Sequence, residues 1–144
     1  MTEVAFHFNA PDKLGYACRL LRKAYLRGAR VVALVEERDR VALDAALWTM
    51  AGGEFIPHSG PTDPVHVQAR SPIHIASEVS ASNGATVLVN LRVDLPAGYE
   101  RFARVIEVVT GDENDRAHAR ERWKSYKAQG IEPQRHDLQL APQD

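Results

Sequence analysis

The residues of this sequence best suited to bind a ligand lie near its end, in the stretch ARERWKSYK (119–127) and just before it. At about 100° per residue on a helix, Arg116, Arg120, Trp123, Lys124 and Lys127 fall on one narrow face. Arginine offers a planar fork that matches a carboxylate, lysine a mobile charge, and tryptophan an apolar wall. The set suits a peptide with acidic residues and an apolar end. Two other interpretations stay open: a solvated helix with its aromatic residues turned to the core, and a site for single-stranded nucleic acid.

Composition places limits on the function. The chain has 144 residues and a formal net charge of -1, so bulk electrostatic attraction does not explain binding to nucleic acid, and an anion must be held by a local patch. The single cysteine, Cys18, excludes an internal disulfide and fits a reducing compartment. Because the sequence has no apolar run of membrane-spanning length and no leader pattern, we expect a cytoplasmic protein with no membrane contact.

Motifs for catalysis are missing from the sequence. The first strand-to-helix turn, FNAPDKLG (8–15), lacks the glycines that allow close approach of the backbone to phosphates, and no phosphate-loop or nucleophile-elbow motif occurs elsewhere. Histidines 58, 66, 74 and 118 have no metal-ligand spacing, and Cys18 sits on an apolar helical stripe, which indicates a core residue. The sequence therefore predicts no catalytic residue, no metal and no cofactor.

Hydrophobic periodicity outlines the elements that must position the basic face. We expect strands at 3–8, 30–35, 65–69, 72–76, 85–91 and 104–109, and helices at 12–27, 37–50 and about 112–129. The alternation of strand and helix predicts an α/β fold with a mostly parallel, twisted sheet flanked by helices, Rossmann-like but without a phosphate-binding loop. Residues 1–135 are expected to form a single domain, and residues 136–144 a loose C-terminal tail.

Two aromatic residues flank a Gly- and Pro-rich loop. Trp48 ends the second helix and Phe55 follows seven residues later. Aromatic residues in such places either cap the core or anchor a partner. The helical spacing favours a core position for Trp48. Phe55 lies in a predicted loop, and there a core position and a partner-binding position are equally expected.

In order along the chain, LDAALW, FIPH, PIHIA, VLVNL, FARVIEVV and ARERWKSYKAQG resemble segments of the chi subunit of the bacterial DNA polymerase III holoenzyme. Each motif alone is weak, but their order is specific, and they cover about residues 30 to 130. The resemblance implies a non-catalytic accessory of the clamp loader. It also implies that the chain binds the acidic C-terminal tail of single-stranded DNA-binding protein, and contacts DNA only indirectly.

The resemblance also assigns residues. The arginine, aromatic and lysine of the family's tail-binding motif carry over to Arg120, Trp123 and Lys124, with a tryptophan where the family often has tyrosine. A tail ending in Asp-Asp-Asp-Ile-Pro-Phe would place its terminal carboxylate on Arg120 and its Phe against Trp123. Lys124 and Lys127 would attract the acidic residues. The contact to a psi subunit, in hosts that have one, would use Phe55, with Trp48 nearby.

Two rival functions come from other classes. A small enzyme acting on a nucleotide or phosphorylated metabolite would use a glycine-poor site at the carboxyl ends of the strands, and nucleotides would then stabilise it against heat. A direct binder of single-stranded DNA would keep its affinity when the protein tail is removed, whereas an adaptor would lose it.

Overall fold

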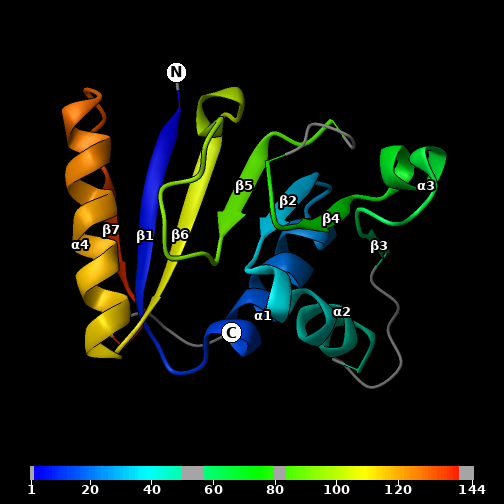
Figure 1. Cartoon of the computed structure of the whole chain (residues 1–144), viewed down its shortest axis with the longest axis horizontal. Helices are drawn as coiled ribbons and strands as arrows, with labels where there is room; N and C mark the ends of the chain where they lie inside the picture. Colours follow the sequence, from blue (N-terminus) through cyan, green and yellow to red (C-terminus); the bar gives the residue numbers. More distant parts are fainter. Residues whose placement is uncertain (1, 50–56, 80–83, 140–144) are drawn as a thin grey trace.

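Parallel strands form the centre of the molecule. The computed structural model describes residues 2–49, 57–79 and 84–139, and within them a seven-stranded sheet has the order β3-β4-β2-β5-β6-β1-β7, with every pair parallel (Figure 1). The mostly parallel sheet expected from the sequence is confirmed. The strands are β1 (Glu3–Ala10), β2 (Val31–Leu34), β3 (His58–Ser59), β4 (Ile73–Ala76), β5 (Val87–Asn90), β6 (Arg104–Thr110) and β7 (Gln134–Asp137).

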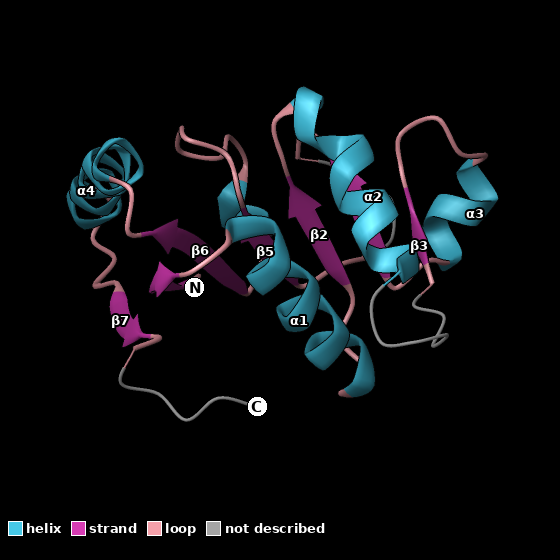
Figure 2. Cartoon of the chain, turned by 90° about the horizontal axis from the view of Figure 1, so that it is seen from below, coloured by secondary structure: helices cyan, strands magenta, loops and turns pink. Residues whose placement is uncertain are grey.

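Helices cover both faces of this sheet. The first two long helices lie on one face, and the last long helix lies on the other, beside β1 and β7 (Figure 2). This arrangement explains why β2 is a continuous apolar run, since all four of its residues are buried. The helices are α1 (Lys13–Leu26), α2 (Arg40–Thr49), α3 (Val65–Arg70) and α4 (Glu113–Ala128), with 3₁₀ turns at Glu37–Asp39 and Tyr99–Arg101.

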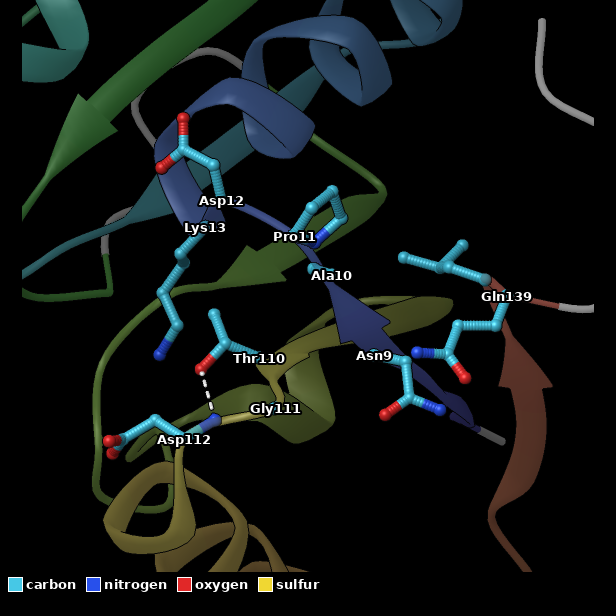
Figure 3. Close-up of a pocket in the computed structure, with 10 residues that line it drawn as sticks. Asn9, Ala10, Pro11, Asp12, Lys13, Thr110, Gly111, Asp112 and Gln139 are labelled. Atoms are coloured by element: carbon cyan, nitrogen blue, oxygen red, sulfur yellow. Dashed lines mark hydrogen bonds between the residues drawn. The ribbon is translucent and has the colours of Figure 1, made fainter.

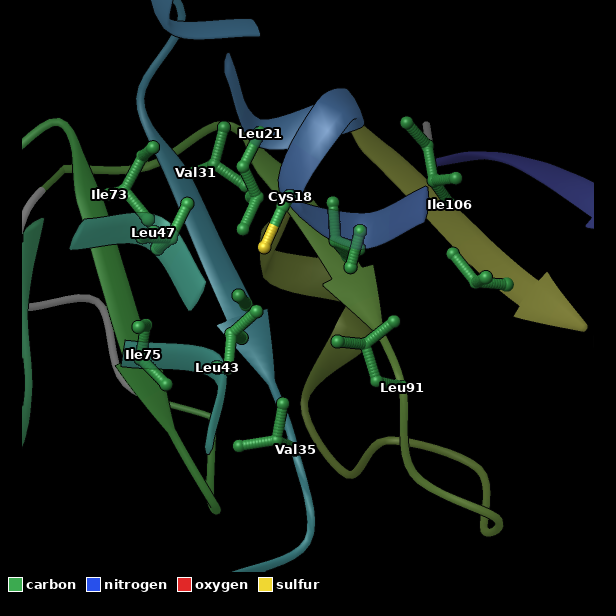
Figure 4. Packing of buried hydrophobic residues seen from close by; sticks show 14 of the residues in the cluster. Cys18, Leu21, Val31, Val35, Leu43, Leu47, Ile73, Ile75, Leu91 and Ile106 are labelled. Atoms are coloured by element: carbon green, nitrogen blue, oxygen red, sulfur yellow. The ribbon is translucent and has the colours of Figure 1, made fainter. Parts of the chain in front are cut away.

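Two hydrophobic clusters occupy the two faces. On the first, Cys18 and Leu21 of α1 and Leu47 of α2 pack on the sheet (Figure 4). Cys18 is 4% exposed, and burial raises the pKa of its thiol, so the prediction of a core cysteine is confirmed. On the second face, Tyr126 of α4 packs against Phe6 of β1. The second cluster fixes α4 on the sheet.

One expected strand is wrong. Residues 65–69 alternate in polarity, but they belong to α3. Pro64 precedes the helix with φ of -54°, and its carbonyl accepts hydrogen bonds from the N–H groups of Val67 and Gln68. Val65 is 80% exposed, so the alternation corresponds to no buried face. Local turn chemistry decides the structure of this short segment.

The last strand was not expected from the sequence. β7 (Gln134–Asp137) pairs with β1 at the edge of the sheet, so residues 136 and 137, which the sequence placed in the tail, extend the sheet. The first three residues of β7 are exposed, which explains why the segment shows no apolar pattern. The register places Arg135 opposite Phe6 and His136 opposite His7. Arg135 therefore lies on the α4 face of the sheet.

Candidate functional site

The basic helix forms as the sequence predicts. Asp112 caps α4 by accepting a hydrogen bond from the N–H of Asp115 at 3.0 Å, and Gly130, with φ of 82°, follows its end. Ala119 and Tyr126 are buried against the sheet. The side chain of Arg120 is exposed, as expected for a binding residue. Trp123 lies between the two faces and is half-buried.

A groove of about 410 Å³ runs between α4 on one side and β1 and the edge strand β7 on the other. Aromatic side chains contribute to its lining, and the rings of Phe6 and Trp123 meet at 5.1 Å between centroids. Of the predicted tail-binding residues, Arg120, Trp123 and Lys124 line the groove. We call it the α4 groove; its lining is Phe6, Phe8, Asn9, Val109, Thr110, Arg116, Ala119, Arg120, Trp123, Lys124 and Arg135.

Of the four predicted tail-binding residues, Lys127 does not line the groove. Its Nζ lies 3.9 Å from a carboxylate oxygen of Glu132, and both side chains are exposed. Lys124 lines the groove but lies 3.5 Å from Glu121. These lysines reach anions within the chain itself, which reduces the charge that they present to a ligand.

Arg135 lines the groove although the sequence analysis did not assign it a role. Its guanidinium carbon lies 5.4 Å from the centre of the Trp123 ring, within the range of a cation–π contact. Arg116 and Arg120 line the groove from the α4 side. Sequence spacing alone could not have found Arg135, because only the pairing of β7 with β1 brings it to the helix.

A buried ion pair holds the underside of α4. Arg122 donates from Nε to Glu107 of β6 at 2.9 Å, and the two side chains are 2% and 0% exposed. Tyr126 Oη and Asn90 Nδ2 donate to the same carboxylate at 2.6 and 2.9 Å. Burial raises the pKa of Glu107, and the Arg122 charge and these hydrogen bonds oppose that rise. The pair fixes the rotation of α4, and with it the direction of the groove residues.

A second ion pair holds the start of the helix. Asp115 accepts from Lys13 of α1 at 2.8 Å and from the backbone N–H and hydroxyl of Thr110 at 2.8 and 2.9 Å. Burial would raise the pKa of Asp115, but the hydrogen bonds from Lys13 and Thr110 outweigh it and lower the pKa. Both ends of the groove-forming helix are thus tied to the sheet or to α1.

Nucleotide-binding α/β folds hold phosphate at the carboxyl ends of their strands, and the chemistry of that place is different in this chain. A cavity of about 640 Å³ lies at the carboxyl ends of β1 and β6, lined in part by Asn9, Thr110 and Gln139 (Figure 3). Asp12 caps α1 by accepting from the Gly15 N–H at 3.1 Å, as Asp112 caps α4. Carboxylates thus occupy the helix starts where a phosphate would bind. This agrees with the missing phosphate loop.

The second predicted surface is described only in part. Trp48 is 56% exposed, so the expectation from spacing that it lies in the core is wrong. Its ring meets that of His58 at 5.4 Å between centroids. Val41, two turns earlier on the same helix, is 70% exposed. We call Val41 and Trp48 the α2 face. Phe55 lies outside the described residues.

The histidines make local contacts. His58 pairs with Asp44 at 2.9 Å, and His74 bonds with Ser59 at 3.0 Å. Within residues 2–49, 57–79 and 84–139 there is no group of three or more His, Cys, Asp or Glu side chains placed to hold a metal ion. Nor does that part of the chain contain a helix long and apolar enough to cross a bilayer.

Fold and site together define a class: an α/β domain whose charged groove lies along a helix at the sheet edge. The family model described as DNA polymerase III chi subunit, HolC, matches residues 1–134. The DNA polymerase III subunit chi of Pseudomonas aeruginosa is 32% identical over 143 residues, covering 96% of this chain and 98% of that protein. The Escherichia coli subunit chi is 28% identical over 120 residues, covering 79% and 78%.

The chain belongs to the DNA polymerase III chi subunit family, as its sequence motifs predicted. It is therefore an accessory subunit of a replication polymerase, and not a catalytic one. Among solved structures, the C-terminal domain of the DEAD-box protein Dbp5 is similar in fold, with a TM-score of 0.62 and 14% identity over 96% of this chain and 91% of that one. That likeness concerns the fold alone.

Proposed function

We propose that the chain is an adaptor that holds the acidic C-terminal tail of single-stranded DNA-binding protein and links it to the clamp loader. The observation that carries the proposal is the α4 groove, where cations surround an aromatic lining. Arg120 takes the terminal carboxylate of the tail, and Trp123 forms the wall for its terminal phenylalanine. Lys124 attracts the acidic residues at the groove, and Lys127 does so from outside it. The place of action is the cytoplasm.

In this proposal Arg120 contributes most of the binding free energy of the peptide. Losing one partner of a desolvated, charge-assisted pair commonly costs about 2–5 kcal/mol. We expect Arg120→Ala to abolish most binding of a peptide ending Asp-Asp-Asp-Ile-Pro-Phe, measured by calorimetry, without changing the melting temperature. Arg120→Lys should restore part of it, because lysine keeps the charge but loses the fork. Arg27→Ala is the matched control, since this exposed arginine lies at the C-terminal end of α1, away from the groove.

Amidation of the peptide identifies the group that Arg120 holds. Amidation should weaken binding as much as Arg120→Ala does, and the two changes together should add little, since both remove one contact. If the amidated peptide binds the Arg120→Ala variant far more weakly than either change alone allows, Arg120 is not the partner of the carboxylate.

The α2 face supports a second contact. Trp48 and Val41 are large apolar side chains exposed on one helix, and aromatic residues dominate interface hot spots. We assign this face, together with Phe55, to the psi subunit of the clamp loader in hosts that have one.

Two experiments separate the adaptor from its rivals. An adaptor should bind full-length single-stranded DNA-binding protein and lose that affinity when the acidic tail is deleted, whereas a direct DNA binder should bind bare single-stranded DNA. A thermal shift assay with nucleotides tests the rival function as an enzyme that acts on nucleotides. A ligand at 100 times its Kd stabilises a protein by about 2.7 kcal/mol. The adaptor should show no shift.

A further inference from the structure

The cations of the α4 groove differ in whether the chain already neutralises them. Lys124 lies 3.5 Å from Glu121, whereas in the described part of the chain no carboxylate lies within ion-pair distance of Arg116, Arg120 or Arg135. Unpaired arginines over an aromatic surface favour an anionic ligand, because each guanidinium keeps its full donor set.

Arg135 is the member of this set that does not come from α4. Its register partner on β1 is Phe6, so its side chain stands beside an aromatic residue of the groove and on the same face of the sheet. Residues of a strand alternate between faces, which sends the neighbouring His136 to the other side, where its ring meets that of His7 at 4.8 Å. Strand pairing therefore fixes which side chain of β7 faces α4.

The Arg135 guanidinium lies over the Trp123 ring. With 5.4 Å between the guanidinium carbon and the ring centre, the arginine rests on the same tryptophan that walls the groove. A guanidinium stacked in this way keeps its in-plane N–H donors free for a second partner. The charge is thus positioned before any ligand arrives, which lowers the entropic cost of binding.

We propose that Arg135 is a specificity-determining residue of the groove, which receives the acidic side chains of the bound peptide from the β7 wall, opposite α4. The inference rests on the proposed function and adds Arg135 to Lys124 and Lys127 as a residue that receives the acidic side chains of the peptide. The lysines reach Glu121 and Glu132 within the chain, at 3.5 and 3.9 Å, so a peptide must compete for them. Among the described residues, no carboxylate lies within ion-pair distance of Arg135.

Two peptides test the proposal, one ending Asp-Asp-Asp-Ile-Pro-Phe and one with its three aspartates replaced by asparagine. We expect Arg135→Ala to weaken binding of the acidic peptide about five- to tenfold, at the upper end of the range for an ordinary hydrogen bond, because the side chain is exposed. The asparagine peptide lacks the carboxylates that Arg135 would bind, so Arg135→Ala should change its affinity by less than about twofold. Arg135→Lys should lie between, because it keeps the charge without the stack. Arg27→Ala, with the same change of charge, should bind both peptides like the wild type.

The results distinguish this inference from the proposed function. An equal loss for both peptides would overturn the assignment and make Arg135 a structural support of Trp123. If Arg120→Ala weakens binding while Arg135→Ala does not, the inference is wrong and the proposed function survives. If the wild-type protein binds neither peptide, both are wrong. The tryptophan emission of free Arg135→Ala should shift while its melting temperature stays within a few degrees, which shows that the stack was removed from a folded protein.

Discussion

At the scale of single residues, Arg122 is a buried cation of α4 to which no sequence motif assigned a role. It lies at helical spacing between two buried residues, Ala119 and Tyr126, and this spacing was a usable signal. Its partner, Glu107, interrupts the apolar strand RVIEVV, where a carboxylate must be buried and needs a cation. A charged residue on the buried stripe of a helix, paired with one in a central strand, predicts a structural ion pair.

Removing one member of this pair should be costly. We expect Arg122→Met to destabilise the fold by about 3–5 kcal/mol, because Glu107 would remain buried without its cation. The double variant Arg122→Met with Glu107→Leu should recover much of that loss. Denaturant unfolding monitored by circular dichroism measures both. A loss of less than about 1 kcal/mol in the single variant, the value of an exposed pair, would contradict a buried pair.

At the scale of elements, α2 shows how a helix can be half core and half surface. Leu43 and Leu47 are fully buried on one side, while Val41 and Trp48 are exposed on the other. The apolar periodicity identified the helix correctly. It could not separate the core side from an apolar surface, because both use the same residue types.

This division gives a sharp comparison between neighbouring residues. We expect Trp48→Ala to change the free energy of unfolding by less than about 1 kcal/mol, since the side chain is 56% exposed. Leu47→Ala, at a position with no exposed surface, should cost about 2–5 kcal/mol. Thermal denaturation of the two variants checks this pair.

The same Trp48→Ala protein then tests the second surface. It should keep its affinity for the acidic peptide and lose that for the psi subunit. A large fall in melting temperature for Trp48→Ala would place the residue in the core and remove the support for a second contact.

At the scale of the whole molecule, positive charge is concentrated in one groove although the net charge is close to zero. The chain has a net charge of -1, yet four cationic side chains line one groove. A ligand far away meets a nearly neutral protein, so attraction acts only close to α4. Binding should therefore depend on salt through a few local charges.

We expect peptide affinity and association rate to fall as ionic strength rises, because exposed charges are screened beyond about 8–10 Å. The measurement is peptide binding from low to high salt by stopped-flow tryptophan fluorescence, to which both Trp48 and Trp123 contribute. The asparagine peptide is the control and should show a weaker dependence. An affinity that is flat across the range would contradict the electrostatic part of the proposal.

The sequence by itself determined the fold class, the parallel pairing, the approximate limits of the three long helices, and the face that carries Arg120, Trp123 and Lys124. These follow from periodicities of 3.6 and 2 and from capping residues, which act over a few neighbouring positions. It also carried the motifs that identify the chi family.

Only the tertiary structure decided which other residues share the site. Arg135 reaches Trp123 because β7 joins the free edge of β1, and an edge strand with exposed side chains leaves no apolar pattern in the sequence. Lys127 shares the helical face of the groove residues but lies outside the groove. A groove needs a second wall, and β7 supplies that wall only beside Trp123. Pairing between residues distant in sequence depends on the sheet order, which local patterns do not encode.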